Sequence, residues 1–126
     1  VYLPSGGTLV LDPCEACLVI DVNSAHDSKQ GRDIRLRANL EAAREIPRLL
    51  RLRQAGGVIL VDFIDLDNAG ERAQVQRALE EGLAKDPVKS QVLGFTRLGL
   101  LEMTRKKADA DLSGTTPKED MNTRDA

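Results

Sequence analysis

"GGVILVDFIDLD", residues 56–67, is the stretch that decides the fold. The stretch begins with two glycines, continues with four aliphatic residues, and then has aspartates at positions 62, 65 and 67. A continuous aliphatic run of this length, bounded by glycines and acids, is typical of a strand buried on both faces. Such strands belong to sheets covered by helices, so the run predicts a layered domain with carboxylates at one edge of its sheet.

The segments on either side of this run supply the remaining elements. Two strands over 8–11 and 17–23, joined by a turn at Asp12 and Pro13, come first, and a helix over 34–54 follows them. After the central strand come a helix over 70–85 and a pair of strands over 90–95 and 98–105. The expected order is β-β-α-β-α-β-β, an α/β domain of the α+β type with a mixed β-sheet flanked by two main helices. Residues 1–107 form this domain, and the polar residues 108–126 are expected to be a disordered tail.

The helix over 34–54 is amphipathic. Its apolar residues recur at helical spacing, at Leu36, Leu40, Ala43, Ile46 and Leu50. Pro47 lies inside this pattern and removes one backbone donor, so we expect it to bend or loosen the helix there, or to split it in two.

The composition restricts the classes of function. A chain of 126 residues with net charge −2 and 2% aromatic residues suits one aliphatic-cored domain and offers few rings on which bases could stack. Basic residues nevertheless gather between Lys29 and Arg53, including Arg32, Arg35 and Arg37. These arginines are either an RNA-binding surface that contacts phosphates or simply the solvated face of the amphipathic helix.

The two cysteines form a lone C-x-x-C at Cys14 and Cys17. A structural zinc site needs a second pair of ligands, which the sequence does not offer, so zinc is not expected. We interpret both as small hydrophobic residues. The sequence has neither a signal peptide nor an apolar run long enough to span a membrane, which favours a soluble protein in the reducing cytoplasm. The chain begins at Val1 and not at Met, which favours a piece of a longer protein.

Two strands end in the same way, "CLVID" at Asp21 and "VILVD" at Asp62. Because strand ends open onto a shared edge of the sheet, these two acids can converge there. Paired carboxylates repel each other unless a cation lies between them, and their hard oxygens suit Mg²⁺ or Mn²⁺. Asn23, two residues after Asp21 on the same strand face, could orient the first carboxylate. The alternative is that these acids only return the chain to solvent.

Other polar residues near this edge carry weaker expectations. Asp65 and Asp67 fit a turn or a helix entry better than a ligand set, and Glu102 could face the same edge. His26, the single histidine, is either a proton donor or a solvated loop residue.

Three long blocks point to a family. "SGGTLVLDPCEACLVIDVNSA", "NLEAAREIPRLLRLRQAGGVILVDFIDLD" and "LGLLEMTRKK" resemble, in order, the catalytic core of the ribonuclease E/G endoribonucleases. The resemblance covers residues 1 to about 107 and implies the deoxyribonuclease I-like subdomain of that core. It also implies a Mg²⁺ ion held by Asp21 and Asp62, with Asn23 orienting Asp21, and hydrolysis of single-stranded RNA to 5′-phosphate and 3′-hydroxyl ends. Lys89 matches a basic residue, usually arginine, and is expected to contact RNA.

The chain also departs from the family pattern. The resemblance does not extend to the oligonucleotide-fold RNA-binding module that precedes the core, or to the C-P-x-C zinc link that follows it and joins protomers. Besides single-stranded RNA, the expected partners are therefore a missing N-terminal RNA-binding module or further copies of the chain in a homo-oligomer. Two functions stay open at this point: a Mg²⁺-dependent endoribonuclease, or an inactive remnant of the same fold that binds RNA or another protein.

Overall fold

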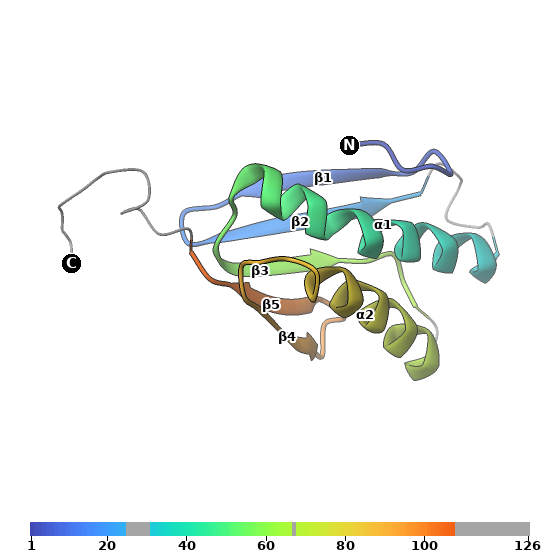
Figure 1. Ribbon diagram of the computed structural model, residues 1–126. Helices are drawn as coiled ribbons and strands as arrows, with labels where there is room; N and C mark the ends of the chain where they lie inside the picture. Colours follow the sequence, from blue (N-terminus) through green and yellow to red (C-terminus); the bar gives the residue numbers. More distant parts are fainter. Residues whose placement is uncertain (25–30, 67, 108–126) are drawn as a thin grey trace, which may run out of the picture.

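The computed structural model describes residues 1–24, 31–66 and 68–107 (Figure 1). His26, Asp67 and the expected tail over 108–126 lie outside the described residues. In chain order the elements are β1 (Thr8–Pro13), β2 (Cys17–Asn23), α1 (Arg32–Arg53), β3 (Gly57–Asp62), α2 (Ala69–Leu83), β4 (Ser90–Phe95) and β5 (Leu101–Arg105). This order confirms the one expected from the sequence. Among the described helices, none is long and apolar enough to cross a membrane.

The five strands form one mixed sheet in the order β1-β2-β3-β5-β4. Within it, β2 and β3 are the one parallel pair among the described strands, and every other pairing is antiparallel. A parallel pair needs a crossover connection, which α1 provides between β2 and β3. Both helices begin at the end of the molecule where β2 and β3 finish, and both lie over the same face of the sheet (Figure 1).

The core lies between the helices and this face. Alternate strand residues point into it, with Leu18, Ile20 and Val22 from β2 and Ile59 and Val61 from β3, all buried. The helices contribute a second set of buried residues: Ala42, Ala43, Ile46, Leu49 and Leu50 from α1 and Val75, Leu79 and Leu83 from α2. Leu36 and Leu40 of the expected stripe are partly buried against this core.

The central strand β3 corrects one expectation, because only one of its faces is covered. Val58 is 46% exposed on the face away from the helices, where Val10 of β1 is also exposed. The unbroken aliphatic run therefore does not mean that the strand is buried on both faces. Within the described residues, α1 and α2 cover one face of the sheet and leave the other face uncovered. This uncovered face is here called the open face. Asp21 and Asp62 belong to strand positions on this open face.

Pro47 does not split α1, which runs without interruption from Arg32 to Arg53. The proline ring is buried and packs against α2 at Gly82, where an added Cβ would lie 2.8 Å from its Cγ. The missing side chain at Gly82 therefore makes room for the ring. The helix ends at Gln54, which adopts the left-handed conformation with φ 52°, one position before the "AGG" expected to stop it.

The β1–β2 hairpin corrects the interpretation of the cysteines. β1 continues through Asp12 and Pro13, so the turn lies at residues 14–16, and Cys14 and Cys17 are joined by a disulfide across it. Cys14 is exposed and Cys17 half-buried, so neither is a core hydrophobic residue. Antiparallel pairing explains the bond, because the two ends of a short hairpin turn face each other.

Candidate functional site

Asp21 and Asp62 are brought together by strand pairing. They are partners in the register of the parallel β2–β3 pair, at the carboxyl ends of both strands. Neighbouring strands lie about 4.8 Å apart, and register partners project to the same face. Both residues are exposed on the open face, and among the described residues neither forms an ion pair. The structure thus places two carboxylates side by side, and none of the described basic residues forms an ion pair with either.

The pKa of Asp62 reflects both its surroundings and this crowding. Partial burial of the carboxyl raises its pKa above the ordinary value, and the negative charges of Asp21 and Asp65 raise it further. The last two causes are those that a bound cation would offset, because a positive charge between carboxylates favours their ionised forms.

Asn23 and Glu102 share the open face with the two aspartates. Asn23 lies two residues beyond Asp21, paired with Thr8 of β1, and no hydrogen bond joins it to Asp21 within the described residues. Glu102 of β5 is exposed and pairs with Leu60, two positions before Asp62 on the same face of β3. No group of three or more acids, histidines or cysteines among the described residues is close enough to form a metal cage.

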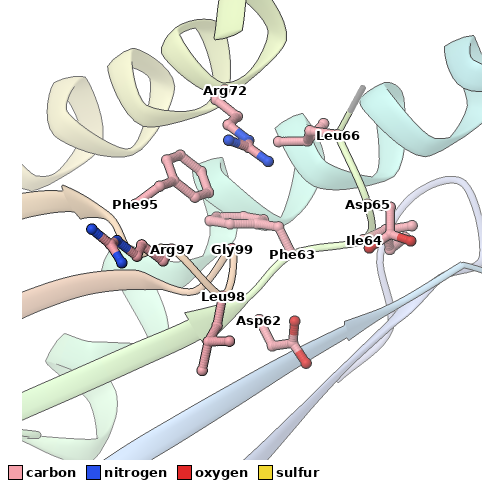
Figure 2. Close-up of a pocket in the computed structure, with 10 residues that line it drawn as sticks. All are labelled: Asp62, Phe63, Ile64, Asp65, Leu66, Arg72, Phe95, Arg97, Leu98 and Gly99. Atoms are coloured by element: carbon pink, nitrogen blue, oxygen red, sulfur yellow. The ribbon is translucent and has the colours of Figure 1, made fainter. Parts of the chain in front are cut away.

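A pocket of about 250 Å³ lies beside Asp62 (Figure 2). Its walls come from the end of β3 and the chain after it, from α2, and from the end of β4 and the β4–β5 turn: Asp62, Phe63, Ile64, Asp65, Leu66, Arg72, Phe95, Arg97, Leu98 and Gly99. In Figure 2 the Asp62 carboxylate and the Phe63 ring point to opposite sides of the strand end. The rings of Phe63 and Phe95 lie 6.2 Å apart, and the Arg72 guanidinium lies 5.8 Å from the centre of the Phe95 ring.

Asn39 fixes the chain that leaves β3. It is fully buried on α1, donates a 2.8 Å hydrogen bond to the Ile64 carbonyl and accepts a 2.9 Å bond from the Ile64 amide. An irregular segment inside a domain must satisfy its backbone groups somewhere, and here one side-chain amide satisfies both groups of one residue. The bonds anchor the segment two residues after Asp62.

The arginines expected to contact RNA lie in the helix layer. Arg32 pairs with Glu71 of α2 at 3.0 Å, and Arg37 pairs with Glu41 of α1 at 3.7 Å. Arg35 is half-buried on the same helix. These two ion pairs favour a role in the helix layer for Arg32 and Arg37, whereas the paired aspartates project to the opposite face of the sheet.

Lys89 lies at the other end of the sheet from Asp62. Its carbonyl accepts a hydrogen bond from the Lys106 amide, and the next residue, Ser90, pairs with Arg105, which in turn is opposite Gly57 at the start of β3. The structure therefore does not bring Lys89 together with the aspartate pair.

Arg97, Arg72 and Asn39 are residues near Asp62 that the sequence did not single out. Arg97 belongs to the turn between two strands, a position that the sequence does indicate. What the sequence does not indicate is the strand order, in which β5 lies between β3 and β4 and brings that turn next to the end of β3.

Comparisons with known proteins show the family of the chain. A sequence model of the ribonuclease E/G family matches residues 1–108. The chain is 45% identical over 109 residues to ribonuclease G of Escherichia coli K12, which covers 85% of the chain and 22% of that protein. It is 44% identical over 114 residues to ribonuclease E of Synechocystis, covering 89% of the chain and 17% of that protein.

Ribonuclease E of Escherichia coli K12 gives 42% identity over 114 residues, again 89% of the chain but 11% of the relative. The chain thus spans about a fifth or less of the length of these relatives. A family match over nearly the whole described region, together with identities of this size, confirms the resemblance seen in the sequence: the chain belongs to the ribonuclease E/G family.

Proposed function

We propose that this chain is the catalytic subdomain of a Mg²⁺-dependent endoribonuclease that hydrolyses single-stranded RNA to 5′-phosphate and 3′-hydroxyl ends. The observation that carries the proposal is the register pairing of Asp21 with Asp62 at the carboxyl ends of β2 and β3. Family membership supports the class of reaction, since the relatives are named ribonucleases.

The chemistry of the two acids fits Mg²⁺ or Mn²⁺ better than zinc or calcium. Mg²⁺ is commonly held by one or two carboxylates with water and phosphate oxygens as its other ligands, whereas Ca²⁺ takes six to eight oxygens and structural zinc takes four protein ligands. Asp21 and Asp62 supply two exposed carboxylates, and the described residues offer no third acid, histidine or cysteine close enough to complete a cage.

Each residue of the site has a distinct role. Asp21 and Asp62 would hold the ion on the open face, and Asn23 would orient the Asp21 carboxylate. A bound Mg²⁺ ion lowers the pKa of a coordinated water and offsets the charge that develops on the phosphoryl oxygens. The buried bonds from Asn39 to Ile64 keep the segment after Asp62 in place, so that this carboxylate does not have to be ordered when substrate binds.

An inactive RNA-binding remnant is less well supported. It would rest on the arginines of α1, and two of these are engaged with Glu71 and Glu41. A preceding RNA-binding module, a homo-oligomer and a cytoplasmic location remain predictions from the sequence and the family.

Cleavage of an A/U-rich single-stranded RNA by the full 126-residue chain tests the proposal. We expect cutting with Mg²⁺ or Mn²⁺ and none in a chelator, and the products should carry 5′-phosphates. A contaminating ribonuclease that leaves 2′,3′-cyclic phosphates would be recognised by its product ends. RNA that is retained but never cut, with either ion present, would favour the binding remnant and contradict the proposed hydrolysis.

A further inference from the structure

The pocket beside Asp62 has features that the aspartate pair does not explain. Two arginines reach it from different elements, Arg72 from the first turns of α2 and Arg97 from the β4–β5 turn. Both are exposed, and neither forms an ion pair with any described residue. By contrast, Arg32 and Arg37 of the helix layer are both paired with acids. The pocket thus combines available positive charge with a position next to the reacting edge.

Arg72 and Arg97 are held in different ways. The Arg72 guanidinium lies 5.8 Å from the centre of the Phe95 ring, and Phe95 contacts Phe63, so the aromatic pair supports the cation. Arg97 is carried by a closed turn in which the Thr96 amide bonds to Leu100 O at 2.8 Å and the Gly99 amide to Thr96 O at 3.0 Å. A third bond runs from the Leu100 amide to Thr96 Oγ1 at 3.2 Å. The ring contact thus restrains the Arg72 guanidinium, and the closed turn fixes the backbone of Arg97, which lowers the entropic cost of bringing the two cations to one anion.

The size of the pocket indicates which part of an RNA it takes. Its volume of about 250 Å³ is below the 300–1,000 Å³ typical of pockets that enclose a whole small ligand. The Phe95 ring that a base could stack on is already covered on one side by Arg72. A phosphate group, which guanidinium groups bind through paired hydrogen bonds, fits these features better than a base.

We propose that Arg72 and Arg97 form a subsite for the RNA phosphate adjacent to the one cleaved at Asp21 and Asp62. The substrate class, RNA, rests on the proposed function. The subsite adds a phosphate-binding site at the end of the sheet where Asp21 and Asp62 lie, opposite the end that carries Lys89. Because phosphates carry no base identity, the subsite contributes affinity without sequence preference.

Binding without cleavage isolates this subsite. The probe is a fluorescein-labelled oligouridylate of about ten nucleotides, a length within the 4–16 nucleotides that one oligonucleotide-fold domain covers, titrated by anisotropy in excess chelator. The variants are Arg72→Gln, Arg97→Gln and the double variant. Arg77→Gln is the matched control, since Arg77 is an exposed arginine of the same helix that does not line the pocket. Thermal denaturation of each variant verifies that it is folded.

We expect the double variant to raise Kd about tenfold or more at low salt, as removal of charge-assisted hydrogen bonds predicts, and Arg77→Gln to change it less than about twofold. The slope of log Kd against log salt should fall by roughly 0.7 for each phosphate interaction that a variant removes from a single strand, equally for oligouridylate and oligoadenylate. Binding by the double variant that matches Arg77→Gln, or no measurable binding by the unaltered chain at low salt, would overturn the subsite.

The same titration separates this proposal from the proposed hydrolysis. Asp62→Asn removes a negative charge from the rim of the pocket, so it should bind the oligouridylate at least as tightly as the unaltered chain while cutting nothing. RNA binding that depends on the two arginines, in a chain that never cleaves RNA, would support the subsite and contradict the proposed hydrolysis. Cleavage by a chain in which neither arginine contributes to RNA binding would support the hydrolysis and contradict the subsite.

Discussion

Asp62 lies opposite Asp21 in the parallel β2–β3 pair, and the pKa of Asp62 is raised by partial burial and by the charge of Asp21. Neighbouring acids make Asp62 costlier to ionise, and carboxylates placed side by side are typical of a site that receives a cation. The described residues supply no ion-pair partner for either carboxylate, so nothing among them offsets the charges that raise the pKa of Asp62.

Replacing Asp62 with Asn should remove activity without unfolding the chain. Cleavage is expected to fall by two or more orders of magnitude, the size of loss seen when a group that stabilises transition-state charge is removed. Mg²⁺ should raise the Tm of the unaltered chain, because a ligand that binds only the folded state stabilises it, and should not raise the Tm of Asp62→Asn. Asp12→Asn, an exposed change of the same charge on β1, is the control for both assays. Undiminished cleavage by Asp62→Asn would remove Asp62 from the site.

The pH dependence of stability gives a separate test of the crowded carboxylate. Because the pKa of Asp62 is raised in the folded state, ionisation of this group disfavours folding at neutral pH. This cost in the free energy of folding disappears as the pH falls through the pKa of the folded state toward the pKa of the unfolded chain. In a chelator, Asp62→Asn should therefore be more stable than the unaltered chain at pH 7. The difference between the two should shrink as the pH is lowered. Urea denaturation at several pH values measures it, and a difference independent of pH would contradict the raised pKa.

Periodicity and strand-end acids allowed much of this arrangement to be predicted. The order of elements follows from the spacing of apolar residues, and the convergence of Asp21 and Asp62 follows from both strands ending at one edge. Periodicity reports which residues are apolar but not which strands become neighbours, so the position of β5 between β3 and β4 was not foreseen. It also does not tell whether a second layer covers a sheet, which is why Val58 was expected to be buried. Asp21 and Asp62 as metal ligands remain a prediction.

Asn39 was missed for a different reason. A polar residue inside a helical pattern resembles a solvent-facing position, and the residue that makes it useful, Ile64, lies 25 positions away. Replacing Asn39 with Leu keeps a similar volume but leaves the partly buried amide and carbonyl of Ile64 without these partners, which should cost about 1–3 kcal/mol in total. Urea denaturation measures this cost.

The same variant has a consequence at the site. With the segment after β3 released, we expect kcat for RNA cleavage to fall and the Mg²⁺ concentration for half-maximal activity to rise. Asn68→Ala, which removes the cap that accepts a hydrogen bond from the Glu71 amide, should cost about 1 kcal/mol with no change in the Mg²⁺ requirement. If Asn39→Leu lowered stability and left both cleavage parameters unchanged, Asn39 would be structural only.

The contact between Pro47 and Gly82 can be tested by a double-mutant cycle. Alanine in place of Gly82 should gain about 1 kcal/mol in helix propensity, but its Cβ would lie 2.8 Å from a rigid proline ring, and overpacking costs about 1–3 kcal/mol. We expect Gly82→Ala to destabilise the unaltered chain and to stabilise the Pro47→Ala variant. Free energies of unfolding from urea titration give the coupling, and additive effects would show that the two residues are not in steric conflict.

The most buried ion pair of the described residues joins Asp86, just after α2, to Arg105 at the end of β5. Their side chains are 0% and 3% exposed, and the Arg105 Nε lies 2.9 Å from Asp86 Oδ2. Arg105 also donates a 2.6 Å bond to the Ala55 carbonyl after α1. Burial alone would raise the pKa of Asp86, but the hydrogen bonds from Arg105 and the Val88 amide, with the charges of Arg105 and Arg51, lower it overall.

Removing one partner of this pair should therefore destabilise the fold more than removing both. Asp86→Asn leaves the Arg105 charge buried without its counterion and should cost about 3–5 kcal/mol. Adding Arg105→Met to that variant should recover part of the loss, because no uncompensated charge then remains. Since the pKa of Asp86 is lowered by folding, its stabilising contribution is present above the unfolded value and is lost as pH falls through the folded pKa. At acidic pH, the difference in the free energy of unfolding between Asp86→Asn and the unaltered chain should accordingly become smaller. If this difference stayed constant down to strong acid, the charge of the carboxylate would not be what stabilises this end of the molecule.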